Sequence, residues 1–405
     1  MPDADVAVVG AGPAGAAAAV RLARAGREVV VLDRARFPRD KCCGDGLTTD
    51  ALRRLDRLGL DPKTVASWQA VNDIVVRSPS GRVARLPFPR DEGTYAAVAQ
   101  RRDLDAALVG LARDAGATVL DGCGLRAANI GADGRVVLEA DDVDPVTARY
   151  AIGADGMWSP LRKALGQAEE AGYLGEWHAF RQYFGGVGPD AAQMWVWFEP
   201  DLLPGYAWSF PLPDGRANVG FGLPRRAGRP TGEMARIWAG LADRPSVRAV
   251  LGAAAEPLEP HRAWPIPARV TSSPLTAAGG RVLFVGDAAR ATDPMTGEGI
   301  AQALETAALA VDAILACGAD DPARVRDRYR RDVSRHLAPN HHLSTALSRV
   351  LRHRKGARGA VRVVGATDWT RRNFARWLFE DYPRAALFSP RTWERGLLSG
   401  PGAFR

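Results

Sequence analysis

Short apolar runs separated by glycine-rich turns dominate the start of the chain. Val6–Val9 is a continuous apolar run of the kind that forms a buried parallel strand. A glycine turn follows, and the alanine-rich stretch 16–25 predicts a helix that ends at Gly26. The run Val29–Leu32 predicts a second buried strand, with Asp33 directly after it. This order predicts a βαβ unit.

Two later regions differ in pattern. Between about residues 177 and 267, short aromatic runs separated by turn residues predict an antiparallel sheet. The apolar run 281–285 then predicts another buried strand, and a long helix follows over 299–316. The strands expected in the sheet are 177–184, 194–198, 206–211 and 216–222; elsewhere we expect strands at 71–77, 82–88, 125–130, 135–140 and 150–152, and helices near 48–58 and 104–115.

The end of the chain is helical in pattern and basic. The protein has 405 residues and a net charge of +8, but residues 321–405 carry 19 Lys+Arg against 7 Asp+Glu, so the remainder is net acidic. Such a segment predicts contact with phosphates or with anionic lipid. A solvated set of arginine-rich helices explains the same charge, and both interpretations stay open.

Composition excludes several classes of protein. The chain is 46% hydrophobic and 25% charged, which argues against a disordered or collagen-like protein. No stretch approaches the ~18–20 unbroken apolar residues of a membrane span, and the apolar N-terminus lacks the positive start of a signal peptide. The four cysteines and six histidines show neither disulfide nor zinc spacing. We therefore expect no metal site, and no fold motif predicts nucleic-acid binding.

The turn Gly10-Ala11-Gly12-Pro13-Ala14-Gly15 joins the first strand to the first helix. Its glycines allow the tight turn, the close approach of a phosphate and the packing of helix on strand. Free N–H groups at the helix start would face a pyrophosphate, and Asp33 would accept hydrogen bonds from ribose hydroxyls. Because a carboxylate there disfavours a 2′-phosphate, the motif predicts FAD or NAD rather than NADP.

Three further segments carry weaker signals of the same kind. Asp287 follows the apolar run 282–285 and can hold a polyol, and the turn 293–299 opens a helix whose positive N-terminus would stabilise a reduced flavin. Asp155 follows another strand, and Arg101 stands at a helix start. Each of these, taken alone, is also compatible with ordinary strand, loop and helix structure.

Together and in this order, the four signals resemble the FAD-binding motif set of glutathione-reductase-like flavoproteins. The branch is the one with the p-hydroxybenzoate hydroxylase-type fold, which aromatic hydroxylases, flavin halogenases and geranylgeranyl reductases share. The resemblance covers about residues 6–316 and implies FAD as cofactor. The residues that it places at the cofactor are Gly10, Gly12, Ala14, Gly15, Asp33, Arg34, Cys43, Gly44, Arg101, Asp155, Gly286, Asp287, Pro294, Gly297, Gly299 and Ile300.

The patterns and the resemblance together imply an α/β fold. It consists of a Rossmann-like FAD-binding domain, an inserted antiparallel β-sheet substrate domain and a C-terminal helical segment. We expect a discontinuous FAD-binding domain at 1–70, 98–168 and 275–320, a substrate-binding β-sheet domain at 71–97 and 169–274, and a basic helical region at 321–405.

Two segments narrow the branch. The loop Arg39-Asp40-Lys41-Cys42-Cys43-Gly44-Asp45-Gly46-Leu47 resembles the cysteine loop of the geranylgeranyl reductase family. Cys43 is the matching cysteine, and Cys42 departs from the small or proline residue expected there. The segment Tyr206-Ala207-Trp208-Ser209-Phe210-Pro211, with Gly220-Phe221-Gly222 downstream, is similar to that family's YxWxFP…GxG signature. Actinobacterial menaquinone and prenyl-lipid reductases are the most similar branch.

Strand alternation puts Tyr206, Trp208 and Phe210 on one face of the predicted sheet, and Trp195 and Trp197 make a similar stripe. Such a face forms either plain core or the lining for a long apolar chain. The resemblance implies an FAD-dependent oxidoreductase acting on CH–CH groups, which saturates isolated C=C bonds in the isoprenoid chain of a prenyl lipid of geranylgeranyl or menaquinone type.

The catalytic candidates are Cys43, Tyr206, Trp208 and Phe210. The rings would stabilise a tertiary carbocation formed as the alkene is protonated. The Cys43 thiol would supply that proton, unless a neighbouring cation makes it a thiolate; a buried structural cysteine is the plainer interpretation. A flavin-dependent monooxygenase or halogenase acting on an aromatic metabolite, and a flavin-binding carrier without turnover, are the alternative functions.

No second glycine-rich unit is visible, so NAD(P)H, ferredoxin and a reduced quinone all stay open as electron donors. In the basic tail, Arg371, Arg372, Arg376 and Arg384 alternate with aromatic and aliphatic residues. This pattern predicts either an amphipathic helix on an anionic membrane surface or a helical cover on the substrate domain. We expect a cytoplasmic protein, peripheral on the inner face of the cell membrane if the first interpretation holds.

Overall fold

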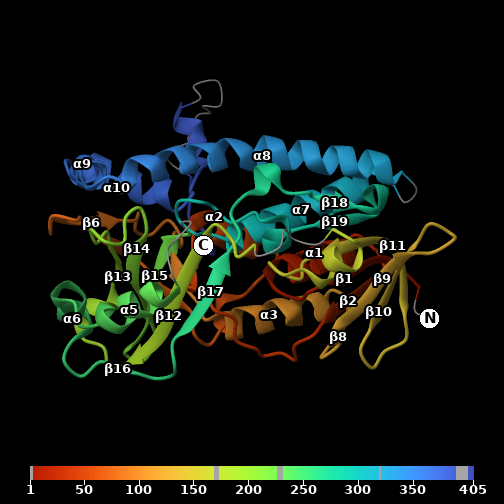
Figure 1. The fold of residues 1–405 in the computed structure, drawn as a ribbon, viewed down its shortest axis with the longest axis horizontal. Helices are drawn as coiled ribbons and strands as arrows, with labels where there is room; N and C mark the ends of the chain where they lie inside the picture. The colour runs from red at the N-terminus through yellow and green to blue at the C-terminus, as the bar shows by residue number, and fades with distance from the viewer. Residues whose placement is uncertain (1–2, 168–172, 226–230, 319–320, 389–399) are drawn as a thin grey trace.

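The computed structural model describes residues 3–167, 173–225, 231–318, 321–388 and 400–405. Within these ranges the chain forms two eight-stranded sheets and a small three-stranded one. Figure 1 shows the two large sheets at opposite ends of the long axis, with a long helix, α8 (Pro322–Leu351), running along one side of the molecule above both. This arrangement confirms the predicted α/β fold with a C-terminal helical segment.

The first sheet is parallel at its centre, as the N-terminal pattern predicts. Its strand order is β18-β19-β11-β1-β2-β8, and β9 and β10 extend it beside β11 as an antiparallel pair. The helix α1 joins β1 to β2 and contacts both α3 and α7. The bounds are β1 Asp3–Val9, α1 Pro13–Arg24, β2 Val29–Asp33, α3 Arg101–Asp114, β8 Thr118–Asp121, β9 Leu125–Ile130, β10 Val136–Ala140, β11 Val146–Gly153, β18 Thr276–Ala277, β19 Val282–Phe284 and α7 Ile300–Cys317.

The second sheet carries the aromatic strands. Its order is β16-β12-β15-β14-β13-β5-β6, with β17 paired to β12. All pairs are antiparallel except β13 with β5, which are parallel and join Met194–Trp197 to Ile74–Arg77. The prediction of a purely antiparallel sheet is therefore wrong at this pair, because the β5–β6 hairpin comes from a distant part of the chain. The bounds are β5 Asp73–Arg77, β6 Val83–Pro87, β12 Trp177–Gly185, β13 Met194–Trp197, β14 Tyr206–Leu212, β15 Arg216–Pro224, β16 Glu256–Pro257 and β17 Arg262–Ile266.

Smaller elements complete the body of the molecule. The helices α5 and α6 belong to the segment that predicted only strands, so that prediction missed them. Their apolar residues Met234, Leu241, Val247 and Leu251 pack in a core on one face of the second sheet. The bounds are β3 Gly46–Leu47, α2 Thr49–Arg57, β4 Gln69–Ala70, β7 Ala97–Val98, α4 Pro160–Ala164, α5 Thr231–Leu241 and α6 Pro245–Leu251.

The C-terminal helices cover the opposite face of the second sheet. Figure 1 shows α9 (Arg354–Val364) and α10 (Asp368–Leu378) near β6, beyond the end of α8. Val361 and Val364 of α9 and Ala375 of α10 share a core with Ile74 and Leu86 of the hairpin. The predicted helical region is confirmed over 322–378, while its residues 389–399 lie outside the described part of the chain.

The helix α7 is long and apolar enough to cross a membrane by composition. It lies within the core of the first sheet, where it contacts α1 and α8. The strands of each large sheet fall within the domain ranges expected from the sequence. We therefore propose those ranges as the division of the chain.

Candidate active site

A large cavity lies where the first sheet, the second sheet and the C-terminal helices meet. Its volume is about 1170 Å³. The glycine turn and Asp33 form one end, residues 39–46 form the middle, and the other end is formed by β13, β14 and the helices α8–α10. Every residue predicted to bind cofactor or to act in catalysis lines this cavity except Gly15 and Pro294.

The glycine turn is fixed by close backbone contacts. Gly10 has φ +97°, and a Cβ there would collide with a neighbouring carbonyl oxygen; a Cβ on Gly15 would collide with the carbonyl oxygen of Gly10. Gly15 thus packs behind the turn. A Cβ on Gly12 would meet only side-chain nitrogens of Arg39 and Arg101, at 3.6 and 3.8 Å. The backbone at Gly12 therefore leaves room for an anion beside two guanidinium groups.

Asp33 holds the turn and the start of the next loop together. Its Oδ2 accepts a hydrogen bond from the Ala11 N–H at 2.6 Å, and its Oδ1 accepts one from the Ala35 N–H at 2.8 Å. The side chain lines the cavity, as does the neighbouring Arg34. Each carboxylate oxygen has a second lone pair, so Asp33 can also accept from a sugar hydroxyl.

Two arginines share one buried carboxylate next to Gly12. Arg101 donates to both oxygens of Asp105, at 2.8 and 2.7 Å, and Arg39 Nη1 lies 2.7 Å from Asp105 Oδ2. The contact of Arg39 has the distance of an ion pair but not the angle of a hydrogen bond, so Nη1 stays a buried donor without an acceptor among the described residues. Two cations against one anion fit a pyrophosphate. Sequence reasoning missed Arg39.

Asp287 is held ionised by Lys41. Its Oδ2 accepts from Lys41 Nζ at 3.0 Å, and its Oδ1 from Thr292 Oγ1 at 3.3 Å. Burial alone would raise the pKa of Asp287, but the charges of Lys41 and Arg101 and the hydrogen bonds from Lys41 and Thr292 together lower it below its ordinary value. An ionised carboxylate at this position suits a polyol.

Asp155 lies between the glycine turn and the short helix α4. Its Oδ2 accepts from the Leu161 N–H at 2.8 Å, while its Oδ1 is buried without a hydrogen bond among the described residues. Burial raises the pKa of this carboxyl to about 6. The unpaired oxygen is a second polar atom at this end of the cavity that a bound group can satisfy.

The N-terminus of α7 is not free, contrary to the expectation. Glu298 Oε1 accepts from the N–H groups of Ile300 and Ala301, at 2.7 and 2.8 Å. We expected this helix N-terminus to face a flavin. Instead, the side chain of Glu298 accepts the hydrogen bonds of its first N–H groups. Pro294 also lies off the cavity wall, and its carbonyl oxygen accepts from Ser348 Oγ at 3.3 Å.

The cysteine loop crosses the aromatic face of β14. A Cβ on Gly44 would lie 3.5 Å from the ring of Phe210 and 3.6 Å from that of Trp208. Burial raises the pKa of the Cys43 thiol, and the nearby charge of Asp45 adds to the rise. The sequence left the thiol and the thiolate open, and this environment favours the neutral thiol. Burial likewise raises the pKa of Cys42 to about 12.

Asp45 ties this loop to the second sheet. Asp45 has φ +64°, and its Oδ2 accepts from the Tyr183 hydroxyl at 2.6 Å and from Asn218 Nδ2 at 2.8 Å. Asn218 also donates to the Cys43 carbonyl oxygen at 2.8 Å and accepts from Trp208 Nε1 at 3.0 Å. Burial raises the pKa of Asp45 to about 6. Sequence reasoning missed these partners, for which the glycine-flanked Asp45 was the available signal.

The three predicted rings form one wall of the cavity. The centroids of Tyr206 and Trp208 are 6.0 Å apart, and those of Trp208 and Phe210 are also 6.0 Å apart. The Tyr206 hydroxyl donates to the carbonyl oxygen of Thr296, which joins this wall to the loop before α7.

The second aromatic stripe lies on the other face of the sheet. In the register of β13 and β14, Val196 stands opposite Trp208, whereas Trp195 and Trp197 stand opposite Ser209 and Ala207. Trp195 and Trp197 pack in the core with α5 and α6 instead. The expectation that they form a similar cavity-facing stripe is therefore wrong. Residues opposite each other on paired strands share a face, and Trp195 and Trp197 stand opposite residues that point away from the cavity-facing rings of β14.

Aliphatic and aromatic residues of the C-terminal helices close the far end of the cavity. Those that line it are Leu347, Val350, Leu351, Ala357, Ala360, Val361, Val364, Phe374, Trp377, Leu378 and Phe379. Two arginines of the predicted interfacial helix point inward instead: Arg376 is buried against Asp381, and Arg384 is also buried. The interpretation as a helical cover therefore holds for these residues, because acids pair with them inside the fold: the nearby Asp381 with Arg376, and Asp293, far away in the sequence, with Arg384.

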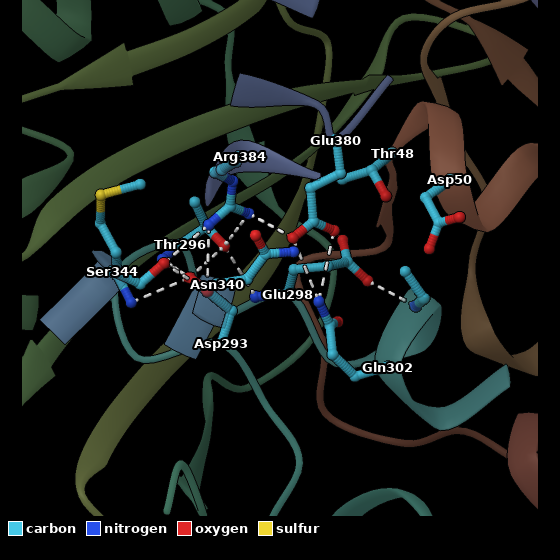
Figure 2. Close-up of polar contacts among 12 residues, drawn as sticks. Thr48, Asp50, Asp293, Thr296, Glu298, Gln302, Asn340, Ser344, Glu380 and Arg384 are labelled. Atoms are coloured by element: carbon cyan, nitrogen blue, oxygen red, sulfur yellow. Dashed lines mark hydrogen bonds and ion pairs between the residues drawn. The ribbon is translucent and has the colours of Figure 1, made fainter. Parts of the chain in front are cut away.

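A buried ionic cluster joins this region to the loop before α7 (Figure 2). Arg384 is 0% exposed and contacts Asp293 Oδ2 at 2.9 Å, Glu380 Oε1 at 2.7 Å and Ser344 Oγ at 3.0 Å. Burial acts to raise the pKa of Asp293, but Arg384 and Ser344 lower it. Burial raises the pKa of Glu380 to about 8. One cation therefore balances one anion, and Glu380 is largely neutral at neutral pH.

Comparison with known proteins is consistent with this geometry. Residues 3–337 match the family described as FAD binding domain. A menaquinone reductase of Mycolicibacterium smegmatis is 36% identical over 83% of this chain and 84% of its own. A digeranylgeranylglycerophospholipid reductase of Methanopyrus kandleri is 31% identical over 81% and 86%.

Solved structures share the fold. A geranylgeranyl bacteriochlorophyll reductase-like protein of Thermoplasma acidophilum superimposes with a TM-score of 0.79 at 22% identity, covering 96% of this chain and 99% of the other. The halogenase PltM in complex with FAD superimposes with a TM-score of 0.72 at 18% identity, covering 96% and 85%.

Proposed function

The chain belongs to the FAD binding domain family, and from this premise we propose that it is an FAD-dependent reductase of prenyl lipids. It saturates isolated C=C bonds in an isoprenoid chain of menaquinone or geranylgeranyl type. The observation that carries the proposal is the continuity of the main cavity. Its polar end, where Gly12 leaves room for an anion, continues into an end that is lined by aromatic rings and by aliphatic side chains of the C-terminal helices.

The polar end fits FAD. Gly12 with Arg39 and Arg101 would hold the pyrophosphate, Asp33 a ribose, and Asp287 the ribityl chain. When bound and reduced, FAD would supply a hydride, which is two electrons and one proton. Residues 39–46 line the same cavity as the polar end and the aromatic wall, so Cys43 contacts the space in which cofactor and lipid would meet.

Reduction of an unactivated alkene needs a proton donor and a surface that stabilises positive charge, and we assign these to the Cys43 thiol and to the aromatic wall. A neutral thiol can give a proton from Sγ to one carbon of the double bond. The faces of Tyr206, Trp208 and Phe210 would stabilise the positive charge on the other carbon by ~2 kcal/mol each in a dry site, which corresponds to about 30-fold in rate per ring. The hydrogen bond to Asn218 fixes the Trp208 ring for this role.

The halogenase alternative lacks a suitable lysine. Of Lys41, Lys63, Lys163 and Lys355, Lys41 alone lines the cavity, and it is paired with Asp287 at the polar end. An aliphatic far end also exceeds what a small aromatic metabolite requires.

We propose further that the protein is cytoplasmic and docks on the inner face of the cell membrane. Three exposed apolar side chains, Val350, Val363 and Trp369, lie on the helices that close the apolar end of the cavity. The surrounding segment carries the net positive charge of the chain, so an anionic lipid surface suits it. The electron donor is NAD(P)H, ferredoxin or a reduced quinone.

An anaerobic single-turnover experiment tests the proposed function. The FAD-loaded protein is reduced with dithionite and mixed with geranylgeranyl diphosphate, which has no quinone ring to accept the electrons. We expect the flavin to reoxidise and mass spectrometry to find the chain heavier by two hydrogens per reduced bond. Flavin that stays reduced with every isoprenoid, but is oxidised rapidly by air when an aromatic compound is added, would overturn the proposal in favour of a monooxygenase.

A further inference from the structure

Two glutamates on the wall between the main cavity and a second pocket have no role in holding FAD or lining the lipid chain: Glu298 is half-buried and Glu380 is buried. The second pocket has a volume of about 540 Å³ and lies among α2, α7, α8 and residues 380–386. Unlike the lipid end of the main cavity, its wall is rich in charged side chains, among them Asp50, Arg54, Glu305 and His336. Such a polar pocket can hold water.

Glu298 stands on the main-cavity side of this wall. Its Oε1 is fixed by two backbone N–H groups at the start of α7, and its Oε2 makes no hydrogen bond within the part of the chain that the structure describes. Burial raises the pKa of Glu298 to about 7, with Asp50 adding to the rise and Arg384 opposing it. The carboxyl is therefore held in one place while it can gain and lose a proton near neutral pH.

Glu380 stands on the second-pocket side. Both of its oxygens accept from Gln302 Nε2, at 3.2 and 3.3 Å, and Gln302 lies one turn after Glu298 on α7. Figure 2 shows the Glu380 carboxyl with Arg384 on one side and Gln302 on the other. The charge of Glu298 adds to the rise in the pKa of Glu380, so the two carboxyl groups interact. The other charged groups near Glu380 are Asp293, Asp50, Arg384 and Arg54.

The outer end of the second pocket reaches solvent. His336 Nδ1 lies 3.6 Å from Glu305 Oε1, and about half of the His336 side chain is exposed. Arg54 bridges Glu305 to Asp50, at 3.4 and 2.8 Å. These charged groups and Glu380 therefore line one pocket, whose outer end is exposed at His336.

The inner end approaches the aromatic wall. The negative charge of Glu298 contributes to the raised pKa of the Tyr206 hydroxyl, so the two groups interact. Tyr206 also donates to Thr296, two residues before Glu298. The inner carboxyl therefore lies next to the ring wall where the double bond would be protonated.

Each saturated bond needs one proton besides the hydride (two electrons and one proton) that reduced FAD would supply. We propose that Glu298 and Glu380 are proton-relay residues, which carry this proton from the second pocket to the lipid end of the main cavity. This inference rests on the proposed function. The Cys43 thiol gives its proton to one carbon of the C=C bond, whose electron pair forms the new C–H bond, and the thiolate takes a proton from the Glu298 carboxyl, which lines the same cavity. The Glu298 carboxylate takes a proton from Glu380, and Glu380 takes one from water in the pocket.

The test compares Glu298→Gln and Glu380→Gln with the exposed control Glu139→Gln. A glutamine at 298 retains an oxygen for the two N–H groups of α7, so folding and FAD absorbance should persist. We expect kcat with reduced FAD and geranylgeranyl diphosphate to fall about 100-fold or more for Glu298→Gln, in the range lost with a positioned proton donor. For Glu380→Gln we expect a smaller fall, a larger solvent isotope effect and a changed pH profile.

If either substitution lowers activity only by distorting the structure of the site, the residual activity should keep the pH profile and the solvent isotope effect of the wild type. Turnover of Glu298→Gln equal to that of Glu139→Gln, with an active wild type, overturns the relay. An inactive wild type refutes the proposed function instead, so the two failures are distinguishable.

Infrared spectroscopy tests the relay without turnover. The FAD-free protein should show the carbonyl band of protonated carboxyl groups at neutral pH, and titration to alkaline pH should remove it. We expect part of this band to be missing in Glu298→Gln and in Glu380→Gln, and to be complete in Glu139→Gln. A complete band in both relay variants would overturn the assignment of the proton to these residues.

Discussion

Replacing Arg384 by methionine tests the buried ionic cluster that anchors the C-terminal helices. Arg384 is fully buried, and its two acids lie at 2.9 and 2.7 Å. Methionine keeps most of the volume but removes the cation. Because Glu380 is already largely neutral, the cost is that of one unpaired carboxylate, Asp293, which keeps its hydrogen bond from Ser344 at 2.6 Å.

The expected loss follows from the general cost of breaking a buried ion pair. Removing one partner costs about 3 kcal/mol or more, roughly 150-fold in the folding equilibrium constant. With a urea slope of about 3 kcal/mol/M, the unfolding midpoint should fall by about 1 M. The matched control is Arg248→Met, which breaks an ion pair with Asp243 whose side chains are 62% and 72% exposed. This exposed pair should cost less than about 0.5 kcal/mol.

The pH dependence of the loss has a definite sign. In the wild type, Arg384 lowers the pKa of Asp293. The ion pair therefore stabilises the folded protein at every pH above the pKa of about 4 that Asp293 has in the unfolded chain. This stability is lost as the pH falls through the lower pKa of the folded state. Without Arg384, burial raises the pKa of Asp293, and the carboxyl can be neutralised by protonation as the pH falls. The difference between wild type and Arg384→Met should therefore be largest at pH 7 and above and should shrink toward pH 5. Equal urea midpoints for the Arg384 and Arg248 variants, or a difference independent of pH, would refute this reasoning.

Three further predictions concern the cavity. Cys43→Ala should lower kcat about 100-fold with FAD binding unchanged, whereas Cys42→Ala should retain turnover; equal kcat values in stopped-flow reduction would remove the Cys43 thiol from the mechanism. Trp369→Ser should weaken salt-sensitive sedimentation with anionic vesicles and leave reduction of a short, water-soluble isoprenoid unchanged; undiminished sedimentation would contradict the docking proposal. Gly220→Ala places a Cβ against Trp208, so it should destabilise the protein by about 2 kcal/mol and shift tryptophan fluorescence; an unchanged spectrum would count against the packing of this ring.

Local patterns in the sequence were sufficient for the first sheet. The βαβ unit follows from an apolar run, a glycine turn and a second apolar run, and each signal lies within about thirty residues of the next. The strand β8 was missed because Thr118–Asp121 is short and mixes polar with apolar residues. The parallel pair of β13 with β5 was missed because it joins segments far apart in the chain, and no local pattern records which distant strand becomes a neighbour.

In the candidate site, too, residues that belong to local motifs could be predicted from the sequence, whereas residues whose role depends on tertiary contacts could not. The glycine turn, Asp33 and the Tyr206–Phe210 stripe are local motifs, and they line the cavity as expected. For Arg376 and Arg384 the sequence leaves a membrane-surface helix and a helical cover both open, because basic residues alternating with apolar ones suit either. Their partners Asp381 and Asp293 became evident only in the folded chain. The role of Glu298 was hidden for the same reason, since its burial depends on residues 380–384.

The contrast between Asp287 and Glu298 argues for separate roles at the two ends of the cavity. Both acids are half-buried and both line the same space, yet the pKa of Asp287 is lowered and that of Glu298 is raised to about 7. The difference arises because Lys41 contacts Asp287 directly, whereas Arg384, the cation nearest to Glu298, is already paired with Asp293. A carboxylate that stays charged is suited to holding a cofactor, and one that titrates near neutral pH is suited to passing protons.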